Sequence, residues 1–304
     1  MNITVLGGGS FGKELFSVLL NNGHNVKMWS SFNEDSCDKG KALEDADVVV
    51  YVRSSKLIRK TMEEFKDFIK EDAIIVNASK GLEEGTLLRL SEVMQDVLSK
   101  NTIAVLSGPS HAEELSQGIP TTLVAASHDL EAAKIIQNLF MNEKLRVYTN
   151  TDVVGVELGG ALKNVIALAT GISDGIGYGD NTKSALMTRG LNEISKLGIA
   201  LGAKGETFSG LSGIGDLIAT CTSVHSRNRR CGILLGQGKS IELAVKEIGM
   251  VVEGVNTAKA AYYMSLKYNV NMPIISQIYN VLENGKNPKQ AVYELMTRDR
   301  REEI

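Results

Sequence analysis

The sequence contains few of the residues that build disulfide frameworks or metal centres. It has three cysteines among 304 residues, Cys37, Cys221 and Cys231, and their scattered spacing forms neither a disulfide framework nor a zinc motif. The four histidines likewise show no metal-ligand spacing. Cysteine usage of this kind is typical of a reducing compartment. We therefore expect no structural metal and no disulfide.

Strong charge of either sign and long hydrophobic runs are also missing. The formal net charge is -3 and the isoelectric point is near 5.9, so nothing general points to a nucleic-acid or membrane partner. No stretch of about 18 uninterrupted apolar residues is present. The chain enters an apolar run at Ile3 without the charged segment and cleavage site of a signal peptide. We expect a cytoplasmic protein, without a membrane span, that holds any anionic substrate with local cations.

The first 150 residues alternate short apolar runs with amphipathic ones. Phe11, Leu15, Val18 and Leu19 have the spacing of one helix face, and residues 57–69 and 87–98 are also helix-like. Strands that alternate with helices predict an α/β fold, a Rossmann-type parallel sheet with helices on both faces. The expected strands are residues 3–6, 25–29, 48–52, 73–76, 103–106, 121–125 and 145–148.

After about residue 150 the strand pattern fades. The helical pattern then recurs at residues 151–173, 182–201, 211–221, 241–248, 253–268 and 273–283. No repeat, low-complexity tract or linker rich in proline or serine separates the two halves, so we expect them to pack closely. The prediction is a dinucleotide-binding Rossmann domain over residues 1–150, followed by an all-helical, substrate-binding domain over residues 151–304.

A glycine-rich turn links the first expected strand to the first expected helix. Gly7, Gly9 and Gly12 give the spacing G-x-G-x-x-G. In dinucleotide-binding folds the first glycine permits the tight turn, the second lets the backbone approach the pyrophosphate, and the third lets the helix pack against the strand. The N–H groups of the helix N-terminus then favour a phosphate. A glycine-rich turn without a ligand is the alternative, but the position between a strand and a helix favours a dinucleotide site.

The end of the second expected strand carries the other cofactor signal. Folds that prefer NAD place an acidic residue there, which binds the ribose 2′-hydroxyl. Here Ser30 and Ser31 follow the strand, whereas Glu34 and Asp35 come later. The missing carboxylate removes a group that would repel a 2′-phosphate, yet no arginine stands there to bind one. The choice between NADH and NADPH stays open, with a slight preference for NADPH.

Lys163 is the most informative candidate for chemistry. It lies in a helical run of small and apolar residues, where an unpaired lysine is costly. The alternative is a side chain that reaches solvent from the helix edge. Burial and a neighbouring cation both lower a lysine pKa, which suits an acid–base group near neutral pH. Lys80, just after the strand at residues 73–76, would be such a neighbour if both lysines face the cleft.

Two more segments carry polar side chains that suit a small anionic substrate. Asp216 lies in the glycine-rich segment 210–217, where simple turn chemistry is the alternative to a functional role. The basic segment 226–230 is either a solvated helix end or a phosphate site with Arg227 as the donor. Nucleic-acid binding by this segment is a third interpretation, which the acidic total disfavours.

Taken together, these segments resemble the NAD(P)-dependent glycerol-3-phosphate dehydrogenases of the bacterial type. The resemblance covers nearly the whole chain, and the matching segments follow the family's order. The most specific are residues 107–113, 158–164, 174–183, 188–190 and 207–217. The resemblance implies NAD(P)-dependent reduction of dihydroxyacetone phosphate to sn-glycerol 3-phosphate, a product that feeds glycerophospholipid synthesis.

The resemblance also implies roles for individual residues. Lys163 would be the general acid and base, with Lys80 and Asp216 beside it in catalysis. The substrate would be contacted by Lys80, Gly108, Ser110, Lys163, Asn164, Asp216, Thr220, Ser226, Arg227 and Asn228. The cofactor would be contacted by Gly7, Gly9, Ser10, Phe11, Gly12, Ser31, Lys80, Ala112, Arg227, Val251 and Glu253.

Three departures from the family lie on the adenosine side of the expected cofactor site. The chain is shorter than the family between Trp29 and Asp47, Ser31 replaces the usual histidine or arginine, and residues 52–55 lack the usual proline. Two other functions therefore stay open: a related dehydrogenase for another substrate, and a cofactor-binding protein with impaired catalysis. The sequence gives no oligomeric state, and a homodimer is compatible with it.

Overall fold

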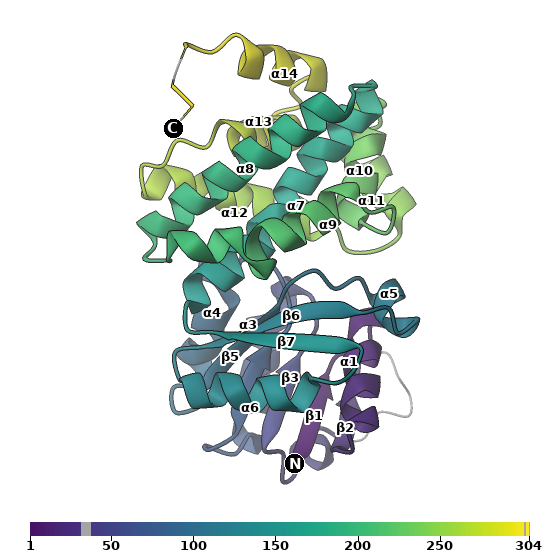
Figure 1. The fold of residues 1–304 in the computed structure, drawn as a ribbon, viewed down its shortest axis with the longest axis vertical. Helices are drawn as coiled ribbons and strands as arrows, with labels where there is room; N and C mark the ends of the chain where they lie inside the picture. The colour runs from purple at the N-terminus through teal and green to yellow at the C-terminus, as the bar shows by residue number, and fades with distance from the viewer. Residues whose placement is uncertain (32–37, 301, 304) are drawn as a thin grey trace.

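A sheet with flanking helices forms the N-terminal lobe and packed helices form the C-terminal lobe of the computed structural model (Figure 1). The structure describes residues 1–31, 38–300 and 302–303. Glu34, Asp35 and Cys37, which the sequence analysis considered, lie outside these residues. The sheet lobe ends with strand β7 (Leu145–Asn150), and helix α7 (Val153–Ile176) begins the helical lobe.

The described residues form one seven-stranded sheet in the order β2-β1-β3-β4-β5-β6-β7. Its strands are β1 (Asn2–Leu6), β2 (Asn25–Trp29), β3 (Val48–Tyr51), β4 (Ile74–Asn77), β5 (Ile103–Ser107), β6 (Thr121–Ser127) and β7. The strands from β2 to β5 are parallel, as the alternating pattern predicts. The expectation of a parallel sheet is wrong for one pair, because β6 runs antiparallel to β5. The connection between them holds only the short helix α5 (Ala112–Ser116), which returns the chain without crossing to the far end of the sheet.

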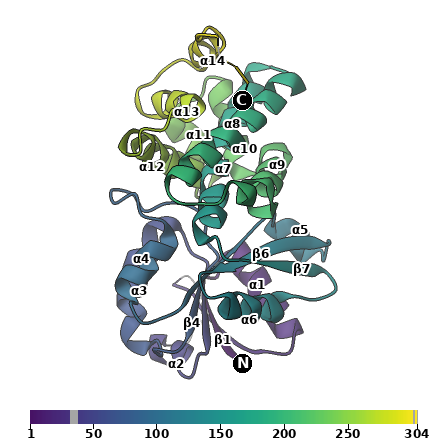
Figure 2. The same ribbon diagram turned by 60° about the vertical axis from the view of Figure 1, so that its left-hand side comes forward.

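Helices cover both faces of the sheet (Figure 2). On one face α1 (Ser10–Asn21) and α6 (Leu130–Phe140) bury a core that includes Leu15 and Phe140. On the other face α2 (Lys39–Leu43), α3 (Ile58–Phe65) and α4 (Leu90–Val97) bury a second core that includes Met62 and Phe65. β3 is buried along its whole length, because it lies between two covered faces. The sequence analysis predicted α1, α3 and α4 but missed α2, α5 and α6.

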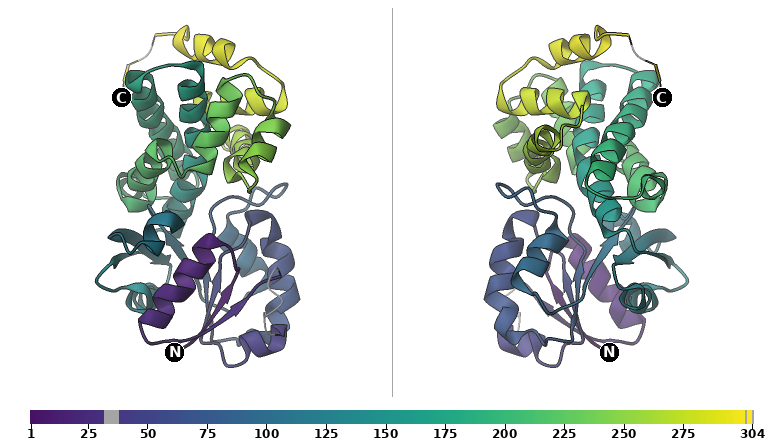
Figure 3. Two further views of the ribbon diagram at one scale, coloured as in Figure 1. Left: turned by 90° about the vertical axis from the view of Figure 1, so that its right-hand side faces the viewer. Right: turned by 90° about the vertical axis from the view of Figure 1, so that its left-hand side faces the viewer.

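The helical lobe is built around α7, as two further views show (Figure 3). Helix α7 is long and apolar enough to cross a membrane. Yet 94% of its most apolar 18-residue stretch is buried inside the protein, so here it is a core helix. The regular elements that the described residues form beyond α7 are all helices, as predicted, although the pattern missed α10 and α14. The surrounding helices are α8 (Asp180–Ala200), α9 (Asp216–Thr222), α10 (Arg227–Gly236), α11 (Ile241–Ile248), α12 (Glu253–Lys267), α13 (Pro273–Glu283) and α14 (Pro288–Met296).

Glycines let α10 lie directly on the backbone of α7. A Cβ on Gly171 of α7 would lie 2.1 Å from the carbonyl oxygen of Arg229, and a Cβ on Gly232 of α10 would lie 2.3 Å from that of Leu168. No side chain fits at such distances, so the two backbones touch only because these positions are glycine. The contact fixes the N-terminus of α10 beside the middle of α7.

We predict that Gly232→Ala destabilises the protein. Inside an ordinary helix this change stabilises by about 0.5–1 kcal/mol, but here the methyl group would overlap the Leu168 carbonyl. The free energy of unfolding, measured by urea denaturation, is expected to fall by about 1–3 kcal/mol. Gly205→Ala is the control, since its Cβ would meet only the end of Ile199 at 3.5 Å. Equal stability of the two variants would contradict the close packing of α7 and α10.

Candidate active site

The carboxylate of Asp216 is placed by a turn that rests on α7. Asp216 is the first residue of α9 and follows a π-helical turn over Leu211–Gly215. A Cβ on Gly159 of α7 would lie 2.5 Å from the carbonyl oxygen of Ser212 in that turn. The absence of a side chain at Gly159 therefore lets the turn approach the helix backbone. Single π-helical turns of this kind are frequent at functional sites.

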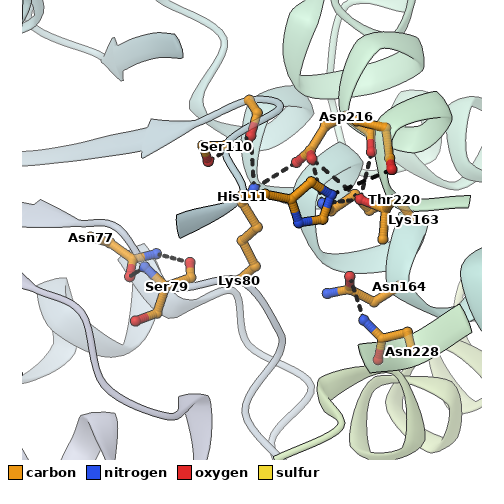
Figure 4. A network of polar contacts seen from close by, with 12 residues as sticks. Asn77, Ser79, Lys80, Ser110, His111, Lys163, Asn164, Asp216, Thr220 and Asn228 are labelled. Atoms are coloured by element: carbon orange, nitrogen blue, oxygen red, sulfur yellow. Dashed lines mark hydrogen bonds and ion pairs between the residues drawn. The ribbon is translucent and has the colours of Figure 1, made fainter. Parts of the chain in front are cut away.

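Asp216 pairs with two lysines that come from different lobes (Figure 4). Its Oδ2 accepts a hydrogen bond from Lys80 Nζ at 2.7 Å, and its Oδ1 accepts one from Lys163 Nζ. Lys80 follows β4 in the sheet lobe, whereas Lys163 lies in the middle of α7. Lys163 is 5% exposed and Asp216 is 2% exposed. One buried carboxylate thus joins the two lobes through two ammonium groups.

Each lysine has one further partner. Lys163 Nζ donates to Thr220 Oγ1 at 2.6 Å, and Lys80 Nζ donates to the carbonyl oxygen of Gly108 at 2.8 Å. An ammonium group has three N–H donors. Within the part of the chain that the structure describes, each lysine therefore keeps one donor for another group. Two such donors beside one carboxylate can bind and polarise a substrate oxygen.

The charges in this cluster shift the pKa values of its members. Burial lowers the pKa of Lys163 and the charge of Lys80 lowers it too, whereas Asp216 raises it, and the net pKa is about 7. Burial also pushes the pKa of Asp216 upward, but the two ammonium groups outweigh it, so the pKa lies below its usual range. Asp216 is therefore ionised at neutral pH, while Lys163 can gain and lose a proton, as a general acid and base must.

The loop after β5 borders the cluster. Ser110 Oγ donates to the carbonyl oxygen of Gly108 at 3.1 Å, so this oxygen accepts from both Ser110 and Lys80. A cavity of about 340 Å³ opens beside Ser110, between α5 and the C-terminal end of α9. His111 also lines this cavity, and burial, with the charges of Lys163 and Lys80, lowers its pKa. The sequence analysis gave His111 no role.

A polar patch lies at the N-terminus of α10, next to α7. Asn228 Nδ2 donates to Asn164 Oδ1 at 2.9 Å, and Asn228 Oδ1 accepts from the backbone N–H of Gly254 at 2.9 Å. The Ser226 hydroxyl caps α10. Arg227 is exposed and makes no ion pair or hydrogen bond with any residue that the structure describes. An unpaired guanidinium and a helix N-terminus together suit a phosphate.

The glycine-rich turn has the geometry that a dinucleotide needs. Gly7 has a φ of +142°, and its Cβ would lie 2.6 Å from the carbonyl oxygen of Val52. A Cβ on Gly12 would lie 2.1 Å from the carbonyl oxygen of Gly7, so α1 packs directly on the turn. A Cβ on Gly9 would meet no atom within 4 Å. Open space therefore lies in front of the first turn of α1, which begins at Ser10 and Phe11, and a pyrophosphate fits there.

The remaining predicted cofactor residues lie on several elements. Ser31 follows β2 and accepts a hydrogen bond from Arg53, Ala112 begins α5, and Val251 is exposed before α12. Glu253, the first residue of α12, accepts hydrogen bonds from the hydroxyls of two serines in the loop after β3, Ser54 at 3.2 Å and Ser55 at 2.7 Å. This contact is a second link between the lobes.

Two charged groups escaped the sequence analysis. Arg53 follows β3 and reaches Ser31 past β1, which lies between β3 and β2, a contact that no spacing along the chain could reveal. Glu157 near the start of α7 accepts from Arg89 Nη1 at 2.7 Å and from the backbone N–H of Ser91 at 2.8 Å, both buried. A glutamate inside an apolar helical run was a signal for this buried pair, which holds the base of α7 against α4.

Comparisons with known proteins agree on one family. The model of the NAD-dependent glycerol-3-phosphate dehydrogenase N-terminus matches residues 2–39 and 33–133. The model of the NAD-dependent glycerol-3-phosphate dehydrogenase C-terminus matches residues 152–293. A glycerol-3-phosphate dehydrogenase [NAD(P)+] from Clostridium tetani is 50% identical over 99% of this chain and 93% of its own length. A glycerol-3-phosphate dehydrogenase [NAD(P)+] from Fusobacterium nucleatum is 48% identical over 100% of this chain and 99% of its own length. The solved glycerol-3-phosphate dehydrogenase from Coxiella burnetii is 35% identical, with a TM-score of 0.93 over 98% of this chain and 99% of that one.

Proposed function

This chain belongs to the NAD-dependent glycerol-3-phosphate dehydrogenase family, and we propose that it reduces dihydroxyacetone phosphate to sn-glycerol 3-phosphate with NAD(P)H, reversibly. The C2 ketone gains a hydride and a proton, and NAD(P)H becomes NAD(P)+. The observation that carries the proposal is the buried cluster of Lys163, Asp216 and Lys80, which keeps two N–H donors for one substrate oxygen.

The cluster supplies acid–base chemistry and charge. When bound, the cofactor supplies the hydride for C2. Lys163 donates its proton to the oxygen on C2 as negative charge develops there, and Lys80 stabilises that charge. Asp216 orients both ammonium groups. In the reverse direction neutral Lys163 accepts the proton from the C2 hydroxyl, which its pKa of about 7 permits.

The patch at the N-terminus of α10 is the proposed phosphate site. Arg227 supplies a fork of donors to which no described side chain is bonded, and Asn228 and Ser226 lie beside it at the start of the helix. Asn164 of α7 follows Lys163 directly and accepts a hydrogen bond from Asn228 of this patch. The phosphate and the reacting carbonyl of a three-carbon substrate would therefore bind at neighbouring positions. Binding energy from the phosphate then positions a substrate whose reacting centre is small.

The proposed cofactor site combines the glycine-rich turn with Lys80, Arg227 and the ends of α5 and α12. Gly7, Gly9 and Gly12 give the turn its shape, and the first turn of α1 faces open space. We propose that NADPH is preferred over NADH, because Ser30 and Ser31 stand after β2 where NAD-specific folds place a carboxylate.

The proposal extends to the setting of the reaction. The described cysteines, Cys221 and Cys231, are buried free thiols, which suits a protein of the reducing cytoplasm. The product would feed glycerophospholipid synthesis. A homodimer is compatible with this proposal, since α12 leaves the large apolar side chains of Tyr263 and Leu266 exposed.

We predict that Lys163→Met abolishes most of the turnover. The methionine keeps an unbranched apolar chain in the buried position but cannot transfer a proton. The kcat for dihydroxyacetone phosphate is expected to fall by about 10²–10⁴-fold, the usual contribution of a general acid, in a spectrophotometric assay with NADPH. Lys196→Met, an exposed lysine of α8, is the matched control and should keep its kcat. Near-normal turnover of a folded Lys163→Met variant would exclude Lys163 as the acid.

We predict that, with the cofactor at a saturating concentration, Arg227→Gln acts through the substrate phosphate. Losing a hydrogen bond to a charged group costs about 1.5–3 kcal/mol, so kcat/KM for dihydroxyacetone phosphate should fall by roughly 10- to 100-fold. The slow reduction of unphosphorylated dihydroxyacetone should change little. Arg230→Gln, an exposed arginine one turn further along α10, is the control. An enzyme indifferent to the phosphate would instead be a dehydrogenase for another substrate.

A further inference from the structure

The adenosine side of the cofactor site lacks the usual determinants after β2. In dinucleotide-binding sheets the end of the second strand lies beside the ribose 2′ position, where a carboxylate selects NAD and an arginine accommodates the 2′-phosphate of NADP. Ser30 and Ser31 occupy these positions here. Neither serine carries a charge, so these positions place no carboxylate that would repel a 2′-phosphate and no cation that would bind one.

An arginine reaches the same point from another strand. Arg53 follows β3, and the sheet order β2-β1-β3 leaves only β1 between its strand and β2. Its Nη2 donates to Ser31 Oγ at 3.2 Å, and its Nη1 donates to Thr61 Oγ1 at 3.0 Å. Its Cγ would lie 3.1 Å from a Cβ on Gly7, so the stem of Arg53 passes along the glycine-rich turn. The guanidinium thus lies between the phosphate-binding turn and the end of β2.

No carboxylate of the residues that the structure describes pairs with Arg53. Its partners among the described residues are hydroxyl groups and the ring of Trp29, whose centroid lies 5.0 Å from the guanidinium carbon. The nearby carboxylate of Glu64 pairs with Lys39 at 2.9 Å. The described residues use two of the five N–H donors of Arg53, and both acceptors are neutral. The group therefore has spare donors and a full positive charge.

We propose that Arg53 binds the 2′-phosphate of NADPH, and that this residue from β3 gives the site its preference for NADPH. A phosphate dianion forms paired, charge-assisted hydrogen bonds with a guanidinium, whereas a ribose hydroxyl offers one ordinary hydrogen bond. The inference rests on the proposed function for the identity of the cofactor. It adds the residue that selects between the two forms.

The single tryptophan of the chain makes the test direct, because Trp29 lies beside Arg53 and dominates the fluorescence. Adenosine 2′,5′-bisphosphate and 5′-AMP differ only by the 2′-phosphate, and each is titrated against the full chain. The unaltered protein should bind the bisphosphate at least about tenfold more tightly than 5′-AMP. Arg53→Gln should weaken bisphosphate binding by about 10- to 100-fold and leave 5′-AMP binding within about threefold.

Two further variants separate a specific contact from general charge. Lys41→Gln removes an exposed cation of α2, whose carbonyl oxygen accepts from Lys27 of β2 at 2.8 Å, and should change bisphosphate binding by less than about threefold. Arg53→Lys keeps the charge but loses the fork, so it should recover part of the affinity. Thermal melting of each variant shows that it is folded. In the enzyme assay, Arg53→Gln should lower the ratio of kcat/KM with NADPH to that with NADH.

The outcomes separate this inference from the proposed function. A protein that reduces dihydroxyacetone phosphate but binds both nucleotides equally would overturn the role of Arg53 alone. An Arg53→Gln variant that still prefers the bisphosphate as strongly, or an equal loss of bisphosphate binding in Lys41→Gln, would overturn it as well. A protein that selects the bisphosphate through Arg53 but reduces no dihydroxyacetone phosphate would support the inference and overturn the proposed function.

Discussion

The buried carboxylate of Asp216 is the group on which the rest of the site depends. It accepts from Lys163 of α7 with one oxygen and from Lys80 of the sheet lobe with the other. Removing one partner of such a buried ion pair costs about 3–5 kcal/mol, because the other charge is left without compensation. The positive charges of two neighbouring ammonium groups repel each other, and the negative charge of Asp216 offsets that repulsion. The same carboxylate therefore joins the lobes and keeps two cations at one point.

Helix α7 holds the acid–base cluster and the proposed phosphate site at a fixed separation. Glu157 fixes its base to the sheet lobe, Lys163 pairs with Asp216, and the next residue, Asn164, pairs with Asn228 of α10. Because all three lie on one buried helix, the distance between the acid–base group and the proposed phosphate site is fixed by helix geometry. Backbone contacts at glycine hold α10 and the Asp216 turn against that helix. Chemical groups held on rigid elements in this way keep their geometry better than groups on loops.

Local patterns predicted much of the fold and the centre of the site. The glycine spacing indicated a phosphate-binding turn, and a lysine in an apolar helix indicated the buried amine that the structure places beside Asp216. The reversed direction of β6 escaped prediction because strand direction depends on how the connection packs, and the periodicity within a strand is the same in both directions. Short helices such as α2 and α5 carry too few residues for a clear period. The contacts of Arg53 with Ser31 and of Glu253 with Ser55 depend on strand order and on lobe packing.

The pH dependence of kcat/KM, measured in both directions, tests the central claim most directly. If Lys163 is the acid and base, with a pKa of about 7, reduction of dihydroxyacetone phosphate needs its protonated form. The kcat/KM for reduction should then fall about tenfold per pH unit above neutrality. The kcat/KM for glycerol 3-phosphate oxidation should rise with pH up to the same pKa and then become constant. Profiles that stay flat through neutral pH, or that slope in the same sense in both directions, would contradict a proton transfer by Lys163.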